Sequence, residues 1–95
     1  MNMEQVGVNE LKRKMREDSV APLRVGATID PNRRAREYEK KYTKNATMYY
    51  AETSKMKSTE NQLLKICSRR GGCWLNVQKS SNVPDDQGYV YAIFP

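Results

Sequence analysis

Histidine is absent from this 95-residue chain, and cysteine and glycine are scarce, with two and five copies. Without histidine, a zinc site within one chain is nearly excluded, and the most frequent general base of enzymes is missing. No serine or cysteine stands beside a plausible base, and no glycine-rich phosphate loop is present. The sequence therefore predicts a non-enzymatic protein that uses no metal and no cofactor.

Long apolar runs are also absent. No run approaches the ~20 residues that span a bilayer, and the first residues lack the apolar centre of a secretory signal. We therefore expect an intracellular protein, in the cytoplasm or nucleus, that is not secreted and does not bind a membrane. In a reducing compartment Cys67 and Cys73 are expected to be free thiols, although a short-loop disulfide across Gly71-Gly72 is the alternative.

What the sequence does contain is positive charge, and that charge is segregated. The net charge is +6, and residues 31–70 hold eleven of the basic side chains against four acidic ones. The segments on either side are close to neutral. A local excess of this kind creates a local field, and it predicts an anionic partner: nucleic acid or an acidic protein surface.

Proline and glycine mark the boundaries of the basic stretch. Asp30-Pro31 can cap and start a helix, Gly71-Gly72 can end one, and neither residue type occurs between them. The region 30–72 is therefore predicted to be helical. It is expected as one long helix, or as two helices over 31–56 and 59–70 because a capping-box pattern begins at Thr59.

Helical spacing gives this stretch two faces. One face would form the core or a homodimer through a stripe of Tyr38, Tyr42, Tyr49, Met56 and Leu63. From Tyr42 onward these residues recur every seven positions, as in half a coiled coil. The opposite face would carry the cations that contact nucleic acid: Arg33, Arg36, Lys40, Lys44, Lys55, Lys65, Arg69 and Arg70. Tyr49, Tyr50 and Trp74 could also stack on bases.

The flanking segments complete a predicted α+β fold that is mainly helical, in a single small domain over 1–95. Residues 1–8 are expected to be frayed, 9–17 to form a short helix, and 19–29 to be an extended connector, packed loosely or adding a strand. The alternating residues of 73–94 predict a C-terminal β-hairpin. Helix, helix and hairpin in this order would allow a winged helix-turn-helix, although Asp85 and Asp86 make its loop acidic.

The sequence thus predicts a small basic binding protein whose helical Lys/Arg face meets duplex DNA or RNA by neutralising phosphates. The alternative is an adaptor, inhibitor or structural component that docks on an acidic protein surface or inside a large assembly. Both hypotheses use the same surfaces, and a homodimer through the tyrosine stripe is compatible with either.

Overall fold

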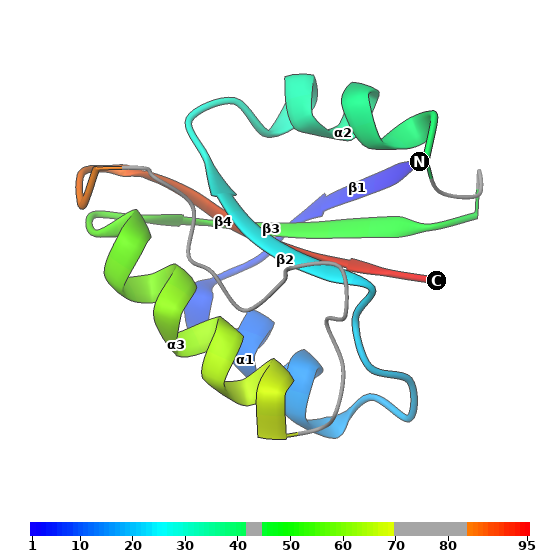
Figure 1. The fold of residues 1–95 in the computed structure, drawn as a ribbon, viewed down its shortest axis with the longest axis horizontal. Helices are drawn as coiled ribbons and strands as arrows, with labels where there is room; N and C mark the ends of the chain where they lie inside the picture. Colours follow the sequence, from blue (N-terminus) through cyan, green and yellow to red (C-terminus); the bar gives the residue numbers. More distant parts are fainter. Residues whose placement is uncertain (42–44, 70–83) are drawn as a thin grey trace.

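The computed structural model describes residues 1–41, 45–69 and 84–95. Strands and helices alternate along the chain (Figure 1). The strands are β1 (Asn2–Gln5), β2 (Arg24–Thr28), β3 (Thr47–Thr53) and β4 (Gly88–Phe94). The helices are α1 (Val8–Glu17), α2 (Pro31–Glu39) and α3 (Met56–Arg69).

The four strands form one mixed sheet in the order β1-β3-β4-β2. β1 runs parallel to β3, while β4 is antiparallel to both of its neighbours. The longest pairing joins β3 and β4, from Thr47 opposite Phe94 to Thr53 opposite Gly88. These two central strands therefore hold the sheet together.

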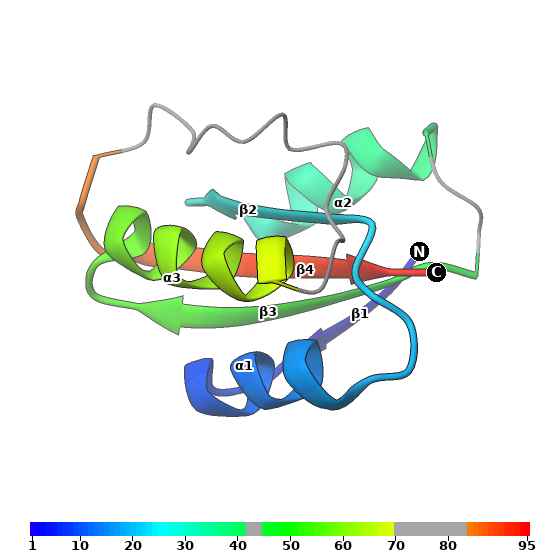
Figure 2. The same cartoon turned by 60° about the horizontal axis from the view of Figure 1, so that its bottom comes forward.

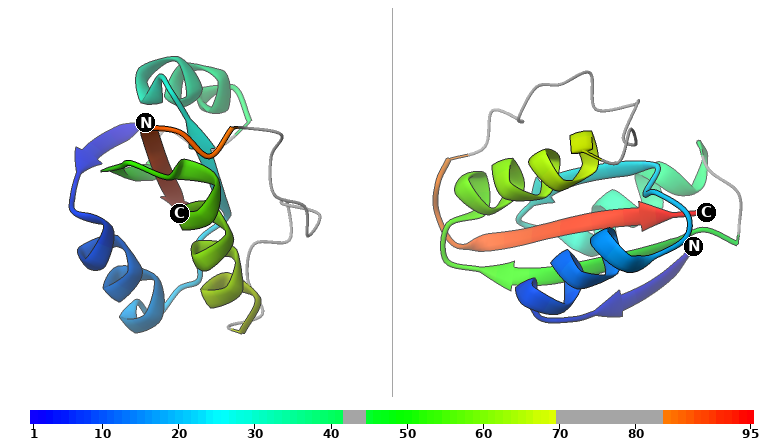
Figure 3. Two further views of the ribbon diagram at one scale, coloured as in Figure 1. Left: turned by 90° about the vertical axis from the view of Figure 1, so that its left-hand side faces the viewer. Right: turned by 90° about the horizontal axis from the view of Figure 1, so that it is seen from below.

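Helices cover both faces of the sheet. α1 and α3 lie next to each other on one face and α2 lies on the other (Figures 2 and 3). Since successive side chains of a strand point to opposite faces, the strands contribute to two separate apolar clusters. The α1–α3 cluster includes Leu11, Leu63 and Val90, and the α2 cluster includes Tyr38, Met48 and Ile93.

The prediction of a mainly helical fold is wrong. Helices make up roughly 42% and strands 29% of the described structure, and β3 lies in the middle of the supposed helical stretch. Thr47 to Tyr50 are β-branched or large side chains that suit a pleated strand. Their alternation buries Met48 on one face and Ala51 on the other. The seven-residue spacing of tyrosines was therefore not a helical signal.

The C-terminal hairpin is also contradicted. β4 exists where a strand was expected, but both of its edges are occupied, one by β2 and one by β3. It therefore cannot be half of a two-stranded hairpin, and with β3 placed between α2 and α3 the winged-helix order is lost too. Residues 73–83, the other half of the predicted hairpin, lie outside the described residues.

The N-terminal part is more ordered than expected. Residues 2–5 form β1 instead of a frayed end, and the connector contributes β2, the less favoured of the two alternatives. The short helix at 9–17 is present as α1. It buries Leu11 and Met15 completely, and this docking compensates for the poor stability of so short a helix in isolation.

α3 starts before the predicted capping box. Its first residue is Met56, and Thr59 is a buried residue of the first turn. The Thr59 hydroxyl donates to the Lys55 carbonyl at 2.8 Å and contacts the Thr53 hydroxyl at the same distance. Thr59 thus ties the helix to the end of β3 instead of capping a new helix.

Candidate nucleic-acid interface

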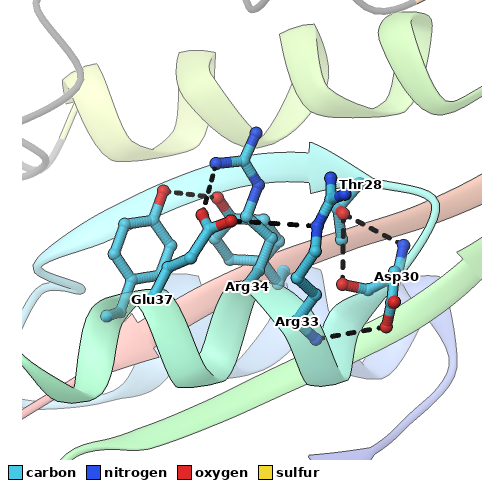
Figure 4. Close-up of polar contacts among 7 residues, drawn as sticks. Thr28, Asp30, Arg33, Arg34 and Glu37 are labelled. Carbon is cyan, nitrogen blue, oxygen red and sulfur yellow. Dashed lines mark hydrogen bonds and ion pairs between the residues drawn. The ribbon is translucent and has the colours of Figure 1, made fainter.

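The sequence Thr28-Ile29-Asp30-Pro31 sets the start of α2 (Figure 4). The Asp30 carboxylate accepts a hydrogen bond from the Arg33 backbone N–H at 3.1 Å, as an N-cap does. The Thr28 hydroxyl accepts one from the Asp30 N–H at 3.0 Å. Proline follows at the first helical position, where its missing N–H costs nothing. The end of β2 therefore fixes where α2 begins over the sheet.

A buried pair of tyrosines packs α2 against the sheet. The hydroxyls of Tyr38 and Tyr91 are 2.9 Å apart in a buried contact, and the Arg24 guanidinium lies 5.2 Å from the centre of the Tyr38 ring. Burial, and then the hydrogen bond with Tyr38, raise the pKa of Tyr91 far above its ordinary value. The Tyr91 hydroxyl therefore stays neutral, and this pair is a structural anchor.

The outer side of α2 carries exposed cations. Arg33 and Arg34 share Glu37, at 3.8 and 2.9 Å (Figure 4). Arg36 and Lys40 are exposed, and within the described residues neither has a carboxylate within ion-pair distance. These two side chains are four residues apart and so are neighbours on the helix surface. They can therefore meet an external anion together.

One flank of α2 faces β1. The Glu39 carboxylate binds the N-terminal ammonium of Met1 at 3.2 Å, at the start of that strand. Arg36 is three residues before Glu39, so it lies on the same side of the helix, and Asn32 is one further turn back. This flank of α2 thus reaches the start of β1 at Glu39.

The α2 face of the sheet carries two partly exposed aromatic side chains, which we call the tyrosine floor: Tyr50 of β3 and Tyr89 of β4. Both side chains are half-buried, and their rings meet edge to face, with centroids 6.0 Å apart and planes at 65°. Gln5 of β1 is in register with Tyr50, and Glu52 is in register with Tyr89. Among the described elements, α2 is the one helix on this face, and the apolar cluster beneath it includes Met48 of β3 and Tyr91 of β4, with Tyr50 packed against it.

The cations predicted on α3 lie on the other face of the sheet. Lys65 and Arg69 are exposed residues of α3, and the exposed Lys55 precedes that helix. α1 adds more cations beside it, with Lys14 placed 4.6 Å from the centre of the Tyr49 ring and Lys12 donating a hydrogen bond to Gln62 of α3. The predicted single basic face is therefore divided in two, because β3 separates α2 from α3. Lys44 and Arg70 lie outside the described residues.

The predicted stripe is also divided between the two faces. Tyr38 is buried under α2, whereas Met56 and Leu63 are buried under α3. Tyr49 is half-buried against the α1–α3 cluster, where its ring meets Phe94 edge to face. Tyr42 lies outside the described residues. These side chains serve two cores of one chain, so they do not form a continuous surface for a second copy.

Two further expectations concern metals and thiols. Among the described residues, no three metal-ligating side chains come together. Cys67 is buried and disulfide-bonded, so the expectation of a free thiol at this position is wrong. Cys73 and Trp74 lie outside the described residues.

Sequence reasoning missed one member of the tyrosine floor. Tyr50 was a stacking candidate together with Tyr49, but these neighbours point to opposite faces of β3. The local sequence does not single out Tyr89 as a partner of Tyr50. The alternation in Tyr89-Val90-Tyr91 contained the signal, but using it required knowing that 47–53 is a strand paired with it.

No helix in the described parts of the chain is long and apolar enough to cross a membrane. No protein-family model, curated protein or solved structure matches the chain.

Proposed function

We propose that this protein is a non-enzymatic nucleic-acid-binding protein, and that it binds through the α2 side of the sheet. One observation carries the proposal: Arg36 and Lys40 of α2 are exposed cations without a carboxylate partner among the described residues, on the face of the sheet where Tyr50 and Tyr89 stay partly exposed. Cations placed in this way bind successive phosphates without reading sequence.

The opposite face is the rival location. It has more cations, but several are engaged within the protein: Arg13 with Glu10 at 3.7 Å, Lys12 with Gln62, and Lys14 with the Tyr49 ring. Two packed helices also cover the α1–α3 side, and the partly exposed Tyr49 on that side already has Lys14 over its ring. We therefore place the binding surface on α2.

The experiment compares matched charge reversals on the two faces. Arg36→Glu with Lys40→Glu changes α2, and Lys57→Glu with Lys65→Glu changes α3 by the same net charge at exposed positions. Binding of labelled DNA and RNA is measured by fluorescence anisotropy at several salt concentrations. Losing a phosphate contact lowers the steepness of the salt dependence by about one unit per residue.

The α2 pair should weaken binding at least roughly tenfold and lower the salt slope by about two units. The α3 pair should have the smaller effect. The proposal is wrong if nucleic acid binds only weakly at low salt, or if the α3 pair has the larger effect.

A second candidate function is binding to an acidic protein. Within the described residues no strand pairs with the outer edge of β1, and such an edge can accept a strand of a partner. The ratio of absorbance at 260 and 280 nm of the purified protein distinguishes the two functions. A preparation free of nucleic acid, with one stoichiometric protein partner, would favour this candidate.

A further inference from the structure

We infer that the ligand is single-stranded nucleic acid, with bases stacked on the tyrosine floor and phosphates along the Arg36–Lys40 flank of α2. This inference rests on the proposed function and names the class of nucleic acid. It commits to a single strand because only unpaired bases expose their faces to aromatic side chains.

The tyrosine floor consists of two aromatic rings in contact. Tyr50 and Tyr89 come from adjacent strands of the sheet and make contact with each other, at 6.0 Å between ring centroids. Both keep part of their surface exposed, whereas Tyr91, on the same face of the sheet, is only 2% exposed and is used to anchor α2. Tyr50 and Tyr89 are therefore the two tyrosines on this face that keep surface accessible to a ligand.

The side chains on the α2 face of the sheet differ in charge. α2 carries Arg36, with the exposed Lys40 one turn further along the helix, while Glu52 of β3 is in register with Tyr89. A phosphate chain is attracted to the cations and repelled by the carboxylate. The strand should therefore run with its backbone along α2 and its bases toward β1 and β3.

The tyrosine floor also has a polar neighbour that could bind the edges of the bases. Gln5 is exposed and in register with Tyr50, and its amide can both donate and accept hydrogen bonds. A base stacked on Tyr50 would present its pairing edge to such a group. In a duplex that edge is already occupied by the complementary base, so the arrangement favours a single strand.

The experiment separates base stacking from phosphate binding by using three labelled probes of the same length, about 12 nucleotides. These are oligothymidylate, an abasic strand with the same phosphates, and a duplex. Wild-type protein should bind oligothymidylate roughly tenfold more tightly than the abasic strand, because stacking contributes to binding for each base. It should also prefer oligothymidylate to the duplex at equal salt.

Three tyrosine variants then locate the stacking site. Tyr50→Leu should lower the affinity for oligothymidylate roughly tenfold and leave the abasic strand unchanged, while Tyr50→Phe keeps the ring and should retain binding. Tyr49→Leu is the matched control, because Tyr49 is the neighbouring half-buried tyrosine on the opposite face. Circular dichroism confirms that each variant is folded.

The inference is overturned if wild-type protein binds the abasic strand as tightly as oligothymidylate, or binds the duplex more tightly. It is also overturned if folded Tyr50→Leu binds oligothymidylate like wild type. The wild-type comparisons need no variant, so they decide the question even if a substitution unfolds the protein. Failure to bind any of the three probes at low salt would instead refute the proposed function itself.

Discussion

Gly26 of β2 lies directly under the Tyr91 ring. A Cβ atom at this position would meet Tyr91 Cζ at 2.5 Å and Cε2 at 3.0 Å, distances that no packed side chain tolerates without movement. The absence of a side chain at residue 26 therefore allows Tyr91 to lean across the sheet and reach Tyr38. One glycine thus determines how closely α2 can sit on the sheet.

Gly26→Ala is expected to destabilise the protein by about 1–3 kcal/mol, because overpacking forces the Tyr91 ring and then α2 to shift. The free energy of unfolding is measured by urea denaturation. Gly7→Ala is the control, since a Cβ at residue 7 meets nothing within 4 Å, and it should change stability far less. Equal effects of the two substitutions would contradict this account of Tyr91 packing.

Among the helices, α3 has an N-terminus that is capped by residues far along the chain. The Met56 backbone N–H donates to the Asp86 carbonyl at 3.0 Å. The Ser58 N–H and hydroxyl donate to the Asp85 carboxylate at 2.9 and 2.8 Å. The first N–H groups of a helix have no partner within the helix, so the turn before β4 supplies the N-terminal cap of α3.

This cap should make stability depend on pH. The backbone hydrogen bond from Ser58, followed by its hydroxyl, lowers the pKa of Asp85 below the ordinary value of 3.8. A carboxyl whose folded pKa is lowered stabilises the protein above its unfolded pKa and loses that contribution as pH falls through the folded pKa. The Asp85 contribution should therefore be complete at neutral pH and begin to decrease below about pH 4.

Asp85→Asn tests this dependence. The variant should be less stable than wild type at about pH 7, and the difference should shrink as the solution is acidified to about pH 3. Urea unfolding at both pH values measures it. Asp86→Asn is the control, because the helix uses the Asp86 backbone carbonyl, which this substitution retains. A difference for Asp85→Asn that stays constant over this range would contradict the assignment of the cap.

At the scale of the whole molecule, the sheet is built outward from β3 and β4. These two strands share seven residue pairs, and each also pairs with one outer strand. Their side chains supply both apolar clusters. β1, by contrast, has four residues and pairs only with β3 among the described strands.

Native-state hydrogen exchange should therefore be slowest for the amides of β3 and β4. The free energy of opening of these amides should approach the free energy of global unfolding, of the order of 5 kcal/mol for a small domain. The β1 amides should exchange faster, through local opening that leaves the rest of the sheet folded. Equal protection of β1 and β4 would show instead that the sheet opens as one unit.

Much of the local structure could be predicted from the sequence. Asp30-Pro31 marks the start of a helix, the spacing of Leu11 and Met15 marks α1, and the β-branched and aromatic run at 89–94 marks a strand. Each of these signals lies within a few residues of the chain, where propensity and capping act directly. The segregation of cations in residues 31–70 is equally a property of the sequence alone.

What the sequence could not give is which segments become neighbours. Tyr49 belongs to a seven-residue spacing with Tyr42 and Met56 that suggests a helix, but pairing with β1 and β4 makes Thr47–Thr53 a strand. That pairing depends on contacts between residues far apart in the chain, such as Tyr50 with Tyr89, which no local pattern contains. The sequence determined that this protein is basic and contains aromatic side chains. Tertiary structure alone decided which cations share a face and which tyrosines come together. The reason is that the register of each strand sets which side chains point to each of the two covered faces of the sheet.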